Sequence, residues 1–172
     1  MSFDTDTTPD DLRIRFYRSS RFQISPLDFP AMFSRPFTLI ATVEKGVVDV
    51  GYDPQNHQIV RLVEGDVVVC PANIWRHSRS NRGVVLEASY MFEIKGGMDL
   101  LTFAGKPFMI TGDAGETLKT LLQELLKSET QPDDRPSLAR SISRQRFGYA
   151  ILDCIFSEYI PDQEILSARR LL

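Results

Sequence analysis

Short apolar segments separated by turn residues occupy the first two thirds of the chain. Residues 12–17 alternate apolar and polar side chains at period two, the pattern of a half-buried strand. Further β-rich segments lie at 37–43, 47–52, 57–63 and 84–94, and a valine run lies at 67–69. Loops rather than helical stretches separate these segments. The pattern therefore predicts antiparallel strands in a sandwich or barrel, up to about Met109.

The apolar residues change to a helical spacing near residue 111. Asp113 and Glu116 are spaced as a capping box, which predicts Asp113 as the N-cap of a helix. Prolines within 131–136 end this helix, and a second helix is predicted over about 137–159. Asp162 and Gln163 are candidate starts of a third. Five leucines share one face of the first helix: Leu118, Leu121, Leu122, Leu125 and Leu126.

Length and composition are those of a soluble protein with one domain and one substantial core. The chain has 172 residues, of which 42% are hydrophobic and 25% charged. A formal net charge of −3 argues against an extended nucleic-acid surface, and we interpret Arg13, Arg15, Arg18 and Arg21 as a solvated strand edge. The first residues show no secretory signal, and no apolar run approaches the ~20 residues of a membrane span. These features predict a cytoplasmic protein without membrane contact.

Residues 62–77 are the most informative stretch. Gly65 and Asp66 suit a tight turn into the valine strand, and Pro71 cannot donate to a ladder, so strand pairing should stop there. A ring, a cation and an imidazole follow in the cluster Trp75, Arg76 and His77. A core does not require three bulky polar-tipped side chains at a strand exit. The cluster therefore indicates a site at the rim of a small barrel, whereas the turn and valines alone are also common architecture.

Residues for metal or nucleophilic catalysis are sparse. The only histidines are His57, predicted at the surface, and His77, whose expected partners on the preceding strand are missing. Cys70 lies in an apolar strand that disfavours a thiolate, and Cys154 also has apolar neighbours. No nucleophile elbow or glycine-rich phosphate loop is present. The sequence thus predicts no bound metal, no cofactor and no enzymatic activity.

Non-covalent binding inside the barrel is better supported. On a strand over 84–94, Glu87 and Ser89 share one face with Val85 and Met91. If that face points inward, a carboxylate and a hydroxyl lie beside apolar walls, as in small-molecule pockets. The alternative places Glu87 in solvent beside Arg82 or Lys95. We expect Trp75 to stack on a ligand, and Arg35 or Arg76 to bind a carboxylate or hydroxyl.

Arg35 and Pro36 precede a strand that ends at Glu44-Lys-Gly, residues 62–77 run from a Gly-Asp turn to His77, and a long strand and leucine-rich helices follow. In these features the chain resembles the cupin-like N-terminal domain of AraC/XylS-type transcription regulators. Residues 62–77 are similar to that family's Pro-Gly-Asp-to-His segment, and the resemblance covers about residues 12–172. Glu64 and Asn73 depart from the family's proline and glycine. Arg76 replaces a common histidine, and the two helix-turn-helix motifs are absent from this chain.

The resemblance implies an α+β, mainly β fold: an antiparallel double-stranded β-helix, or cupin-like jelly-roll barrel, followed by two to three C-terminal helices. It implies a flexible arm at 1–11, the barrel at 12–110, dimerisation helices at 111–162, and the start of a linker at 163–172. An effector, a sugar or small metabolite, would bind non-covalently in the barrel. DNA would be contacted only through a C-terminal domain absent from this chain. The candidate ligand-binding residues are Arg35, Trp75, Arg76, His77, Glu87 and Ser89.

A homodimer is the expected assembly, with Leu118, Leu121, Leu122 and Leu125 at the interface. The alternative is that both helices only pack on their own barrel. Two alternatives to the sensor function stay open: a metal-dependent cupin enzyme, such as an isomerase or dioxygenase, and an interaction module with a collapsed barrel.

Overall fold

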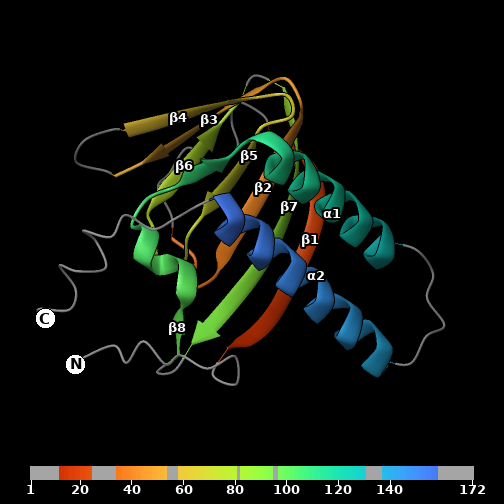
Figure 1. The fold of residues 1–172 in the computed structure, drawn as a ribbon. Helices are drawn as coiled ribbons and strands as arrows, with labels where there is room; N and C mark the ends of the chain where they lie inside the picture. Colours follow the sequence, from red (N-terminus) through yellow and green to blue (C-terminus); the bar gives the residue numbers. More distant parts are fainter. Residues whose placement is uncertain are drawn as a thin grey trace, which may run out of the picture.

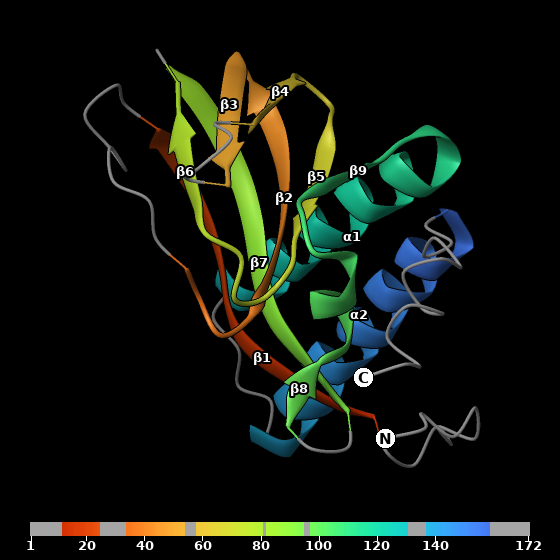
Figure 2. The ribbon, with the colours of Figure 1, turned by 90° about the vertical axis from the view of Figure 1, so that its left-hand side faces the viewer.

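The computed structural model describes residues 12–24, 34–53, 58–80, 82–94, 97–130 and 137–158. The arm at 1–11, the linker at 163–172, the start of a third helix and His57 lie outside these ranges. Within them, a large sheet lies between a small sheet on one face and two helices on the other (Figures 1 and 2). The expected α+β, mainly β fold with C-terminal helices is confirmed.

The large antiparallel sheet has the strand order β1-β7-β2-β5-β9, and β8 adds to β7. Its strands are β1 (Arg13–Ile24), β2 (Thr38–Lys45), β5 (Val67–Cys70), β7 (Gly83–Ile94), β8 (Met98–Asp99) and β9 (Phe108–Ile110). The long strands β1 and β7 lie side by side and extend beyond the small sheet (Figure 1). A short 3-10 helix, η2 (Leu100–Ala104), follows β8, and the Asp99 side chain caps its N-terminus.

The small antiparallel sheet has the order β4-β3-β6, formed by β3 (Val47–Tyr52), β4 (Gln58–Val63) and β6 (Arg76–Arg79). The described strands form two separate sheets and not one continuous closed ring. The resemblance implied a closed jelly-roll barrel, whereas the described strands form two facing sheets. The strand β6 was not predicted, because its residues Arg-His-Ser-Arg lack the apolar and β-branched side chains that indicate strands.

The turn at Gly65 and Asp66 carries the chain from the small sheet into the large one. Gly65 has a φ of 93°, a conformation that glycine adopts at little cost, and its N–H donates to the carbonyl of Val43. The Asp66 carboxylate accepts a hydrogen bond of 2.7 Å from the backbone N–H of Val63. The predicted tight turn, with Asp66 bonded to nearby backbone, is confirmed.

Because of a β-bulge at Tyr17, β1 contributes side chains to two hydrophobic cores, one between the large sheet and the helices and one between the two sheets. Phe16 pairs with Tyr90, and both face the helices, whereas Arg18 pairs with Ser89. The extra residue between these pairs changes the face that alternate side chains present. Residues of β1 before the bulge therefore pack under the helices, and Phe22 and Ile24 after it face the small sheet.

The helices α1 (Gly112–Thr130) and α2 (Ser137–Glu158) cover the other face of the large sheet (Figure 2). Leu118, Leu122 and Leu125 are fully buried in the core that α1 and α2 form with this sheet, and Leu121 is half-buried against it. These leucines, predicted at a dimer interface, lie in the core of the chain itself. That is the alternative the sequence left open, and it follows because an apolar sheet face needs an apolar helix face to cover it.

The helix α1 starts two residues earlier than predicted. The helix begins at Gly112, and the N–H of Gly115 donates to the carbonyl of Thr111. Asp113 therefore lies within the first helical turn and is not the N-cap. Its carboxylate is still at the end of the helix where a negative charge is favourable.

Candidate functional site

The space between the two sheets has apolar walls and two small adjoining cavities. Buried side chains of both sheets, among them Val43, Val48, Leu62 and Val68, form the walls. The outer cavity has a volume of about 50 Å3 and the deeper one about 40 Å3. Both are lined by Phe22, Ile24, Leu39, Arg76, Ser78 and Glu87. We call this pair of cavities the inter-sheet cavity.

Glu87 points into the inter-sheet cavity from the middle of β7. It is 4% exposed, so the inward-facing alternative for this strand face holds and the solvent-facing one is wrong. Its Oε1 accepts hydrogen bonds from Arg18 Nη2 at 2.6 Å and from the Ser20 hydroxyl at 3.2 Å. A buried carboxylate is thus held by a cation and a hydroxyl, as burial of charge requires.

Three arginines surround this carboxylate. Arg76, from β6, is 2% exposed and lines both cavities, whereas Arg18 and Arg35 line only the outer one. Burial lowers the pKa of Arg76, and the negative charge of Glu87 acts in the opposite direction. The arrangement gives the outer cavity a cationic side and leaves the deeper cavity largely apolar.

Of the six residues predicted to bind a ligand, the structure brings Arg35, Arg76 and Glu87 together. Trp75 is 53% exposed and lines a different surface pocket, with Tyr52 and Lys106. His77 is on the outer face of the small sheet because side chains alternate along β6, so Arg76 points inward and its neighbour outward.

Ser89 and His77, both predicted to bind a ligand, do not line the inter-sheet cavity. Ser89 is fully buried on the Glu87 face, and within the described part of the chain its Oγ has no hydrogen-bond partner. It is not among the residues that line the inter-sheet cavity. The His77 ring lies so close to Gly51 that a Cβ on Gly51 would be 2.0 Å from His77 Cε1.

Sequence reasoning missed Arg18, which lines the outer cavity, and Ser20, which donates to Glu87. Both follow the bulge at Tyr17, which changes the face that β1 presents, and the period-two pattern of residues 12–17 does not predict that change. Arg18 therefore pairs with Glu87 and is not simply part of a solvated edge. The sequence did contain one signal. Ser20 is two residues after Arg18, so in an extended strand the two side chains share one face.

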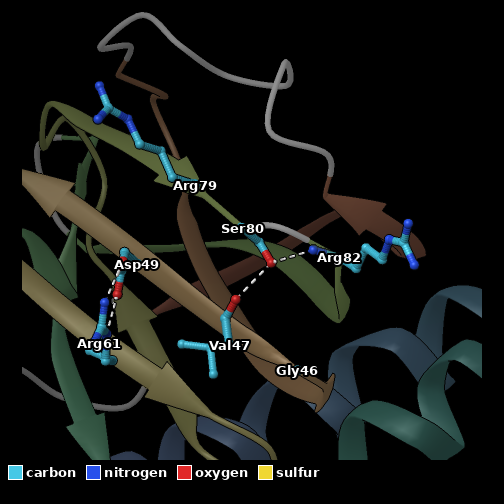
Figure 3. A pocket seen from close by; sticks show the side chains of 7 residues that line it. All are labelled: Gly46, Val47, Asp49, Arg61, Arg79, Ser80 and Arg82. Carbon is cyan, nitrogen blue, oxygen red and sulfur yellow. Dashed lines mark hydrogen bonds and ion pairs between the residues drawn. The ribbon is translucent and has the colours of Figure 1, made fainter.

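A second pocket lies on the outside of the small sheet, near the loop between β6 and β7 (Figure 3). It is an open depression of about 670 Å3, with Arg61 paired to Asp49 at 2.8 Å. Ser80 organises the loop: its Oγ donates to the carbonyl of Val47 at 2.6 Å and accepts from the N–H of Arg82 at 3.2 Å (Figure 3). Figure 3 shows the Arg79 and Arg82 side chains extending away from each other, so they do not converge on one point.

Groups for other chemistry are limited in the described ranges. No cluster of three His, Cys, Asp or Glu residues that could hold a metal ion occurs there. Burial raises the pKa of the Cys70 thiol to about 11, so this cysteine is protonated at neutral pH, as its apolar strand predicted. Within the same ranges, neither helix combines the length and apolar character needed to cross a membrane.

Comparison with solved structures supports the fold. The chain is similar to the AraC-like transcriptional activator CuxR, with a TM-score of 0.51 and 9% identity over 86% of this chain and 51% of that protein. A cupin superfamily protein from Desulfitobacterium hafniense is similar at TM-score 0.36 and 12% identity, over 48% of this chain and 78% of that one. The TDP-quinovose 3,4-ketoisomerase WlaRB from Campylobacter jejuni gives TM-score 0.36 and 16% identity, over 46% and 66%.

Sequence comparison adds no family assignment. No protein-family model matches the chain, and no curated protein matches it. The likeness to CuxR confirms the resemblance drawn from the sequence at the level of fold. The chain spans about half of CuxR, so the activity of that whole protein is not carried over by the likeness.

Proposed function

We propose that this chain is the small-molecule-sensing and dimerising part of an AraC-type transcription regulator. The observation that carries the proposal is the burial of two charged residues, Arg76 and Glu87, beside apolar walls between the two sheets. Buried charges cost free energy unless they are paired, and they often mark a ligand site. Fixed polar groups in an apolar concavity are the usual composition of such a site.

Binding without chemical conversion is the proposed activity. A ligand held between the sheets would stabilise one conformation of the domain and so shift its populations. The DNA-binding step would belong to a different segment, and the fold-level likeness to an AraC-like activator supports this division.

We also propose that a second copy of the chain binds along α2. Four large apolar side chains are exposed on this helix: Leu138 (69%), Ile142 (49%), Tyr149 (49%) and Phe156 (42%). Their spacing of four, seven and seven residues follows a heptad, which two copies of one helix can satisfy mutually. The proposed dimer interface is therefore the exposed stripe of α2, in place of the leucines of α1 that were predicted from the sequence.

The proposal is tested by thermal unfolding of the purified chain with a panel of sugars, polyols and small carboxylates. A compound that binds only the folded state raises the midpoint of unfolding, and the rise grows with the logarithm of its concentration once that exceeds the dissociation constant. Such a concentration-dependent rise with any compound supports the sensor. No rise with any member of the panel favours an interaction module, and metal at a molar ratio near one by elemental analysis would favour a cupin enzyme.

A further inference from the structure

We infer that the surface pocket beside Trp75 is a second binding site, which takes a small planar heterocycle of the nucleobase type stacked on the indole. The pocket lies outside the inter-sheet cavity and shares none of its described lining residues. Binding here is therefore additional to the proposed sensor function. The size of the pocket, the exposure of Trp75 and the residues around that ring support the site.

Four segments that are distant in sequence form the pocket. Tyr52 ends β3 and Asp53 follows it, Gln58 begins β4, residues 73–75 lie between β5 and β6, and residues 105–106 lie between η2 and β9. The volume is about 390 Å3, within the roughly 300–1,000 Å3 of small-molecule pockets, whereas the cavities between the sheets are about 50 and 40 Å3. The pocket therefore accommodates a ring-sized ligand without movement of the sheets.

Trp75 gives the pocket a stacking surface. It is the only tryptophan of the chain and is 53% exposed. A single exposed apolar side chain is common on protein surfaces, so exposure alone does not mark a site. Here Tyr52 lines the same pocket, so two aromatic side chains border one space. An exposed indole offers a flat apolar face, and every nucleobase has a π-face that can stack on it.

The backbone around Trp75 is held in an uncommon conformation. Within the described ranges, Asp53 and Asn73 are the two non-glycine residues with a positive φ, at 59° and 62°. Both line this one pocket. The Asn73 N–H also donates to the Arg35 carbonyl at 2.7 Å, which fixes the loop that leads to Trp75. Residues in sparsely populated backbone regions cluster at ligand sites, where the surrounding structure holds them in place.

Two amide side chains supply polar groups for the edge of the ring. Gln58 and Asn73 are exposed and line the pocket. A carboxamide has a donor and an acceptor side by side, which match the neighbouring acceptor and donor on the edge of a nucleobase. A sugar on the same indole would give up water at several hydroxyls, which costs free energy unless each hydroxyl finds a partner. The lining thus favours a flat ring with a polar edge over a saccharide.

The test is titration of the chain with adenosine, cytidine and uridine, followed by tryptophan fluorescence and by calorimetry. Because Trp75 is the only tryptophan, a ring stacked on it quenches the whole tryptophan signal. Ribose is the control compound, since it has the sugar hydroxyls of the nucleosides without their ring. We expect saturable quenching and saturable heat with the nucleosides, and neither with ribose.

Four variants locate the site by calorimetry. Trp75→Ala should weaken nucleoside binding at least about fivefold, the effect of losing one base–aromatic stack, and Trp75→Phe should bind more tightly than Trp75→Ala. Gln58→Leu should weaken binding about fivefold through the loss of one hydrogen bond. Tyr17→Ala removes an aromatic side chain of similar exposure, 47%, from β1 and should leave the affinity unchanged. Thermal unfolding of each variant without ligand shows whether it is folded.

The contrary outcomes are distinct. Ribose binding as tight as that of the nucleosides would overturn the heterocycle assignment. Equal losses in Trp75→Ala and Tyr17→Ala would overturn the location, because the Tyr17 ring stacks on Phe37, which lines the outer cavity. No saturable binding of any nucleoside would overturn the site and leave the sensor proposal standing, since the two sites share no described lining residue.

Discussion

Arg18 and Glu87 form an ion pair between an exposed and a buried side chain. Their nitrogen and oxygen are 2.6 Å apart, yet the Arg18 side chain is 58% exposed and that of Glu87 is 5% exposed. The long arginine side chain reaches down from the surface, which satisfies the carboxylate without burying a second complete charge. Glu87 in turn lies near Arg76, which has much less access to water.

Replacing Glu87 should therefore cost far more stability than replacing another glutamate on the same strand. Glu87→Ala leaves the buried Arg76 without this carboxylate, and we expect the free energy of unfolding to fall by about 3–5 kcal/mol. Glu93→Ala, which breaks the pair with the exposed Arg15, should cost about 1 kcal/mol or less. Urea unfolding of both variants measures the difference, and equal losses would contradict the role given to Arg76.

Cys70 should make the domain less stable at alkaline pH. Its pKa is raised from 9.0 to about 11 by burial, so the folded state keeps the proton that the unfolded state releases. The corresponding stability is complete below pH 9 and is lost as the pH rises through about 11. Cys70→Val removes this group and should flatten the decline between pH 9 and 11, measured as the urea midpoint against pH. Cys154→Val, at a less buried position, is the matched control.

Gly51 and His77 should show strong energetic coupling. Gly51→Ala places a methyl group where the imidazole lies, so we expect destabilisation, although alanine is otherwise favourable relative to glycine in a strand. In a His77→Ala background the same change should cost little or nothing. A double-mutant cycle with interaction energy above about 0.5 kcal/mol confirms the contact, and additive effects would show that the ring moves away freely.

The two helix faces should respond differently to substitution. Leu122→Ala creates a cavity in the core and should cost about 2–5 kcal/mol of stability without changing the oligomeric state. Ile142→Lys and Tyr149→Lys lie on the exposed α2 stripe and should leave the stability of the monomer nearly unchanged. If α2 binds a second copy, they should raise the dimer dissociation constant at least about tenfold in analytical ultracentrifugation. An unchanged constant would remove the stripe from the interface.

Periodicity and turn chemistry were sufficient to predict most of the fold. The strands over 47–52 and 84–94 and both helices are close to their predicted ranges, because each combines a clear apolar period with a glycine, proline or polar boundary. The strand β6 was missed because its inward positions are Arg76 and Ser78, which carry no apolar signal. Its place in the small sheet comes from pairing with β3, a contact that no local pattern reveals.

The candidate site was predictable only where a strand face was known. The alternation along β7 placed Glu87 on one face with Val85, Ser89 and Met91, but it left open whether that face points inward or to solvent. Trp75 and His77 were grouped with Arg76 because they are adjacent in sequence, but adjacent residues of a strand point to opposite sides. The leucines of α1 show the same limit, since an apolar helix face does not reveal whether it meets its own sheet or another chain.

Because of the bulge at Tyr17, neighbouring residues of β1 contact the two sides of the large sheet: Phe16 faces the helices and Arg18 faces the inter-sheet cavity. Arg18 is in contact with the cavity carboxylate, and Phe16 lies under the Arg144 guanidinium at 5.0 Å from the ring centroid. The Tyr90 hydroxyl, on the strand next to Phe16, donates to the Arg144 carbonyl at 3.1 Å. Phe16 and Arg18 are separated by Tyr17 alone, so two peptide units join the residue that contacts α2 to the residue that contacts the buried carboxylate. A displacement of Arg18 would therefore act on β1 directly beside the position where this strand packs against α2.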